Sequence, residues 1–264
     1  MNRYSLNSKA ASRRLSSQSG FTLIEILLVA AGIVLFMGLI LQLGPGVMIK
    51  FNVAHDAGQL AQVKTLATSY LTEERSFGRI PLTEGATGIP ASATAGGNMT
   101  ALAAAARFDD VLVGEGLLDK VMRSALSPNV ATSGSIPVRW DSVNQRFDAT
   151  AAPDMDYSSA SRFECRVSTG TGTLSAPAAG PVPSAAAGGN FRLDGVNGLV
   201  GNVRVLYRVL PAVHLPAALA LSQKLDGTDL SQTDATTTDD RGSVVYAVTA
   251  GSDTTTVYVY VAQY

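Results

Sequence analysis

The most uneven feature of the chain is its first fifth, where a polar, basic stretch is followed by a long apolar run. Residues 1–19 carry four cations and no acid, whereas residues 21–49 contain a single charge, Glu25. A helix over residues 21–43 would extend roughly 35 Å, which is enough to cross a hydrocarbon core of about 30 Å. The pattern therefore predicts a basic leader (1–20) and a membrane-spanning helix (21–50).

The end of the apolar run predicts a hinge followed by a second helical stretch. Gly44, Pro45 and Gly46 weaken a helix, so we expect the chain to kink, stretch or melt there. Beyond them, apolar residues recur at three- and four-residue steps to about Phe77, which predicts an amphipathic helix docked on a domain. Its expected apolar stripe is Val53, Ala57, Leu60, Val63, Ala67, Tyr70 and Leu71.

The remainder, residues 51–264, is expected to be an exported α+β domain in which the long N-terminal helix packs on a mainly antiparallel β-sheet. Turn residues and alternation locate the shorter elements. The expected helices are 100–113, 116–126 and 216–225. The expected strands are 136–140, 145–149, 162–168, 203–209, 243–249 and 255–261. Residues 83–98 and 169–190 are expected to be loops.

The apolar segment has three interpretations: a cleaved secretory signal, a plain anchor, or part of a processed filament subunit. Val29-Ala30-Ala31 would suit signal cleavage, but the apolar run continues to Leu41, which disfavours a signal. The cations Arg13 and Arg14 predict a cytoplasmic N-terminus and an exported remainder. An acid at Glu25 is either an N-terminal helix residue favoured by the helix dipole or a functional intramembrane charge.

A short motif favours the third interpretation. Gly20-Phe21-Thr22-Leu23-Ile24-Glu25, between the basic leader and the apolar run, resembles the class III leader of type IV pilins and type II secretion pseudopilins. The resemblance implies that a prepilin peptidase cuts after Gly20 and methylates Phe21. It also implies pilin-like architecture, with Glu25 guiding assembly by pairing with the new amine of a neighbouring subunit.

By this resemblance, the chain is expected to be a structural pilin or pseudopilin subunit in a bacterial inner membrane. Its implied partners are the prepilin peptidase, other pilin or pseudopilin subunits and the assembly platform of the inner membrane. The alternative is a single-span anchored or exported binding module that forms no filament. The chain has 20 basic and 21 acidic residues, and this balance gives no indication of nucleic-acid binding.

Catalytic and metal-binding chemistry is weakly indicated. His55, His214 and Cys165 share no recognisable motif, so no enzyme is expected, and Asp109-Asp110 is expected on a solvated helix face. No cofactor is required. One acidic, Thr-rich stretch offers oxygen ligands that would suit calcium, although its spacing matches no EF-hand. Its residues are Asp226, Asp229, Asp234, Asp239 and Asp240.

Overall fold

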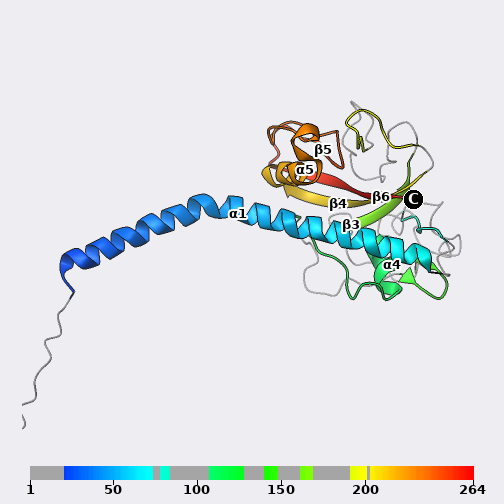
Figure 1. Cartoon of the computed structure of the whole chain (residues 1–264), viewed down its shortest axis with the longest axis horizontal. Helices are drawn as coiled ribbons and strands as arrows, with labels where there is room; N and C mark the ends of the chain where they lie inside the picture. The colour runs from blue at the N-terminus through cyan, green and yellow to red at the C-terminus, as the bar shows by residue number, and fades with distance from the viewer. Residues whose placement is uncertain are drawn as a thin grey trace, which may run out of the picture. The chain divides into compact units, whose positions relative to one another are not determined.

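The chain has an α+β fold with a four-stranded antiparallel sheet (Figure 1). This computed structural model describes residues 21–73, 78–83, 107–127, 140–147, 161–168, 191–200 and 203–264, without the side chains of residues 39–43, 45, 146, 147 and 167. The chain divides into two compact units, Met1–Pro45 and Gly46–Tyr264.

The described helices are α1 (Leu23–Thr72), α4 (Phe108–Gly114) and α5 (Leu215–Leu230). A small hairpin pairs β1 (Trp140–Asp141) with β2 (Arg146–Phe147). The main sheet contains β3 (Arg162–Val167), β4 (Arg204–His214), β5 (Val244–Tyr246) and β6 (Thr254–Gln263), in the order β3-β4-β6-β5. The predicted hairpins and central strands are therefore confirmed, with shifted ends.

In the first unit, α1 exposes its apolar side chains all around the helix. Every large hydrophobic residue from Phe21 to Met37 is more than half exposed, with Phe21 at 83%. Within the residues that the structure describes, no helix meets the length and hydropathy expected of a membrane span. The helical assignment continues through Gly44, Pro45 and Gly46, so the chain does not melt at the predicted hinge.

In the second unit, α1 is amphipathic, as predicted, and ends at Thr72 rather than near Phe77. Its buried positions follow a spacing of three and four residues, which keeps them on one face of the helix. One member of this stripe is charged: Asp56 is 1% exposed, whereas the predicted Ala57 is only partly buried. The buried stripe is Val53, Asp56, Leu60, Val63, Ala67 and Tyr70.

The main sheet separates two apolar clusters because alternate strand residues point to opposite faces. Leu206 and Val259 belong to the larger cluster, which also contains the α1 stripe and residues of α4 and α5. Tyr207 and Tyr258 belong to a smaller cluster with Phe191. The helices α4 and α5 contact opposite edge strands, β3 and β5 respectively.

Two local predictions are wrong. Residues 116–126 form turns and extended chain rather than a helix, because Gly116 adopts a positive φ of 74° and the backbone that follows bonds to α1. Asp109 and Asp110 are fully buried instead of solvated. Asp110 lies 2.6 Å from the guanidinium of Arg107, which is also buried. The predicted loops over 84–98 and 169–190 lie outside the described residues.

A buried charge network lies on the face of β3 that is opposite to Phe163 and Cys165. Glu164 accepts hydrogen bonds from Arg162 (2.6 Å), Arg166 (3.0 Å) and the Tyr207 hydroxyl. Burial raises the pKa of Glu164, but the two guanidinium groups and the hydrogen bonds lower it more strongly, and the net shift is downward. The ionised carboxylate therefore stabilises the folded chain.

We expect Glu164→Gln to lower the free energy of unfolding by about 3 to 5 kcal/mol near neutral pH, because Arg162 and Arg166, both buried, each lose a counter-charge. Since the folded pKa lies below the unfolded one, this contribution is present above about pH 4.5 and disappears as the pH falls through the folded pKa. Urea unfolding of the detergent-solubilised chain at several pH values would measure the difference. Asp229→Asn, at an exposed carboxyl, is the control, and a difference that stays constant into acid would contradict the prediction.

Candidate functional site

The start of α1 holds the first candidate site, a reciprocal hydrogen-bonded cap between Thr22 and Glu25. The Glu25 carboxylate accepts from the Thr22 backbone N–H (2.8 Å) and the Thr22 hydroxyl (3.0 Å). In return the Glu25 N–H donates to the Thr22 hydroxyl oxygen at 3.3 Å. This is the Thr-x-x-Glu capping box, which satisfies N–H groups that the first helical turn leaves unpaired.

The capping box gives Glu25 a local partner that sequence reasoning missed, although the spacing of Thr22 and Glu25 is a readable signal for it. Phe21 precedes the cap and is exposed, while Gly20 lies outside the described residues. The cleavage and methylation of this segment therefore stay predictions. A kink or stretch of α1 at Gly44, Pro45 and Gly46 also stays a prediction. These residues lie at the boundary between the two units.

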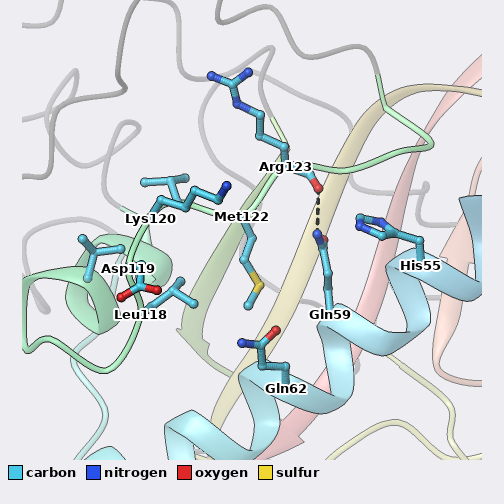
Figure 2. A pocket seen from close by; sticks show the side chains of 10 residues that line it. His55, Gln59, Gln62, Leu118, Asp119, Lys120, Met122 and Arg123 are labelled. Atoms are coloured by element: carbon cyan, nitrogen blue, oxygen red, sulfur yellow. Dashed lines mark hydrogen bonds between the residues drawn. The ribbon is translucent and has the colours of Figure 1, made fainter.

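A groove of about 800 Å³ beside α1 is the second candidate site (Figure 2). One wall is α1, which contributes His55, Gln59 and Gln62. The facing wall is the irregular chain after α4, where the side chains of Lys120 and Met122 lie opposite the helix (Figure 2). The groove therefore combines polar, apolar and charged side chains rather than one kind of chemistry.

Two side chains of α1 fix the facing wall of the groove. The amide nitrogen of Gln59 donates to the Arg123 carbonyl at 2.9 Å (Figure 2). The Asp56 carboxylate accepts from the Ser124 hydroxyl and from the Ala125 N–H at 3.0 Å. The Ser124 hydroxyl oxygen in turn accepts two backbone N–H groups of the following turn. Chain that was predicted to be helical is thus held extended against α1.

Asp56 also lies 3.8 Å from the guanidinium of Arg208, a fully buried residue of β4. That guanidinium stacks on the Phe163 ring, 5.0 Å from its centroid. Burial lowers the pKa of Arg208, while the carboxylates of Asp56 and Asp109 raise it, and the net shift is downward. The buried carboxylate of Asp56 therefore connects α1, the sheet and the groove wall.

The residues considered for catalysis lie on separate elements. His55 lines the groove and lies 3.3 Å from Asp56, whereas His214 is exposed at the end of β4. Cys165 is buried on β3, and burial raises the pKa of its thiol to about 12. A thiol with that pKa is not a nucleophile near neutral pH. The described residues thus provide no Cys/His pair in one site.

The acidic residues proposed for calcium are mostly used for local hydrogen bonds. Asp226 accepts three bonds from Ser243 and Val244 at the start of β5. Asp234 accepts bonds from Thr236 and Thr237, and Asp239 accepts one from Ser222. Asp240 lies 3.3 Å from Arg192, and Asp229 is exposed on α5. Among the described residues, no group of three or more potential ligands converges.

Comparisons with known proteins do not assign the chain to a family. No protein-family model, curated protein or solved structure matches it. Inferences about function therefore depend on the residues and geometry of this chain.

We expect Asp56→Asn to lower the free energy of unfolding by about 2 to 4 kcal/mol, because Arg208 loses a buried counter-charge and the groove wall loses hydrogen bonds. Hydrogen exchange should show faster exchange at Ala125 and its neighbours than in the wild-type chain. Asp119→Asn, on the exposed surface of the same groove wall, is the control. Unchanged protection of this segment would show that Asp56 does not hold it.

Proposed function

We propose that the chain is a structural pilin or pseudopilin subunit of a type IV pilus-like or type II secretion filament. A prepilin peptidase would cut between Gly20 and Phe21 and methylate Phe21. The chain would be held in a bacterial inner membrane through residues 21–50 before assembly by the inner-membrane platform. The pilin-like arrangement would place the exported domain outside a core of packed α1 helices.

The observation that carries this proposal is the exposed apolar surface of α1 directly after the cleavage motif. Large hydrophobic side chains from Phe21 to Met37 are more than half exposed around the helix. A contiguous apolar surface of this kind needs lipid or other protein to cover it. The small residues Ala30, Ala31 and Gly32 would let neighbouring helices approach closely. Lipid before assembly and neighbouring α1 helices after it would both satisfy this requirement.

The proposed role of Glu25 follows from the energetics of buried charge. Cleavage would create a cationic amine at Phe21, and both this amine and the Glu25 carboxylate are unfavourable to bury alone. Pairing the amine of one subunit with Glu25 of the next favours one axial register over slipped ones. A buried polar pair is best attested in this role of selecting geometry.

The capping box supports a second candidate function, a single-span anchored or exported binding module that is not assembled. Because Thr22 satisfies the Glu25 carboxylate within one chain, a helix start can explain the acid without a neighbouring subunit. The two functions differ in what they require of the Glu25 side chain: the cap requires a hydrogen-bond acceptor, whereas pairing with an amine requires a negative charge.

The processing step predicts a specific mass change. In membranes of a host that has a prepilin peptidase, we expect the recovered chain to begin at Phe21 and to carry one added methyl group. Intact-protein and N-terminal peptide mass spectrometry would measure this, with Gly20→Ala as the unprocessed control. A chain that begins at Met1, or after Ala31, would contradict processing as a filament subunit.

Conservative variants of Glu25 separate the two functions. Glu25→Gln keeps a capping-box side chain but removes the charge, so we expect normal insertion and processing and about a tenfold or greater loss of sheared filaments. Thr22→Val removes the Thr22 hydroxyl from the cap and keeps the negative charge of Glu25. Filament yield, measured by shearing and immunoblotting against total subunit, would be the assay.

The anchored-module function makes the opposite prediction for these variants. Glu25→Gln would then behave like the wild-type chain, and Thr22→Val would have the larger effect on the helix start. Wild-type filament yield from Glu25→Gln would rule out amine pairing as the basis of assembly.

A further inference from the structure

We propose that the groove beside α1 binds the acidic α5–β5 loop of a second copy of this chain, in a head-to-tail contact. The acidic loop is defined here as residues 226–240, which comprise the last residues of α5 and the chain that follows them toward β5. The contact rests on the proposed filament, because assembly would hold copies side by side. It adds to that proposal a specific pair of surfaces between the exported domains.

The groove presents cations and a hydrogen-bond acceptor to an occupant. Lys120 and Arg123 are exposed on its wall, with one opposing carboxyl from Asp119 and the imidazole of His55. The Oε1 atom of Gln59 is buried and has no hydrogen-bond partner among the described residues, although its amide nitrogen is bonded. An occupant that brings negative charge and hydrogen-bond donors would satisfy both features.

The acidic loop has this composition. Residues 226–240 contain five aspartates, five threonines and no cation. Asp229 and Asp234 are exposed, whereas Asp226 and Asp239 are engaged in hydrogen bonds within the domain. Hydrogen bonds from Thr236 and Thr237 lower the pKa of Asp234, so its carboxyl stays charged. The exposed charges are thus negative, and the exposed hydroxyls of Thr228 and Thr233 supply donors.

The two surfaces lie at opposite edges of the sheet, so one domain cannot bring its own loop to its own groove. The groove wall continues from α4, which contacts the edge strand β3, and the acidic loop joins α5 to the opposite edge strand β5. Figure 1 shows α4 and α5 on opposite sides of the exported domain. Complementary surfaces placed in this way form heterologous contacts, which repeat from copy to copy and build open chains or rings.

Charge reversal tests the contact in the full-length chain. We expect Lys120→Glu with Arg123→Glu to reduce association between copies by about tenfold or more, because like charges then face each other. Asp229→Lys with Asp234→Lys should have a similar effect. All four substitutions in one chain should restore association, since both signs are then reversed. Asp253→Lys, at an exposed acid in the β5–β6 turn, is the control and should have no effect.

Disulfide crosslinking gives a readout that does not require filaments. A chain with Gln62→Cys in the groove and a chain with Thr233→Cys in the loop are expressed together, and their mixed disulfide is measured after mild oxidation. The single native thiol, Cys165, is buried and should not compete. Membrane insertion and N-terminal processing of every variant are checked in the same samples to establish that each chain is correctly made.

The outcomes separate this contact from the proposed function. A mixed disulfide that is lost on charge reversal and returns in the fourfold variant supports the contact. Filaments that form at wild-type level in both reversal variants, without the mixed disulfide, overturn the contact and leave the proposed function standing. A charge-dependent disulfide in a chain that is not processed and forms no filament supports the contact and overturns the proposed function.

Discussion

The buried carboxylate of Asp56 is the interaction on which the arrangement of the second unit, Gly46–Tyr264, depends. It lies in the middle of the apolar stripe of α1, where an uncompensated charge would be strongly unfavourable. The surrounding chain compensates it with the Ser124 hydroxyl, the Ala125 N–H and the guanidinium of Arg208. None of these partners belongs to α1: Ser124 and Ala125 lie in the chain after α4, and Arg208 lies on β4. One side chain thus determines how α1 contacts both the sheet and the chain after α4.

This arrangement explains why a groove lies beside α1 and not a continuous apolar contact. The Asp56 carboxylate accepts hydrogen bonds from Ser124 and Ala125, and the Gln59 amide donates to Arg123, so that residues 123–125 are held as extended chain. This extended chain does not fill the space along the helix, and the groove is the space that remains. The stability of the groove wall is therefore coupled to the docking of α1.

The start of α1 gives Glu25 one partner within the chain, and the proposed filament would give it a second. Within one chain, Glu25 completes a capping box with Thr22, which satisfies polar groups of the first helical turn. A neighbouring amine would be a stronger partner for the carboxylate, because the attraction between opposite charges grows as water is excluded. Exchange of the local partner for the neighbouring one would link assembly to the loss of water around the helix start.

The sequence by itself determined the elements whose residues repeat with a clear period. The amphipathic half of α1 follows from the three- and four-residue spacing of its buried positions. The strand at residues 162–168 and the terminal hairpin follow from strand-forming residues bounded by turn residues. The composition of residues 226–240 identified the acidic loop, and the resemblance of residues 20–25 to a class III leader identified the motif around Glu25. The hydropathy of the sequence also separated the highly apolar residues 21–49 from the remainder, in which polar and apolar residues are interspersed.

Only the tertiary structure decided which polar residues are buried and which segments lie together. Asp56, Asp109 and Asp110 are as polar as any surface acid. Asp56 is buried beside Arg208 of β4, which is distant in the sequence, and Asp110 is buried beside Arg107, whose own burial is set by the tertiary structure. Residues 116–126 have helix-compatible composition, yet bonds to α1 outweigh that weak local preference. Periodicity predicts which face of a helix or strand is buried. The pairing of Asp56 with Arg208 and the placement of irregular chain depend on contacts between residues that are distant in the sequence.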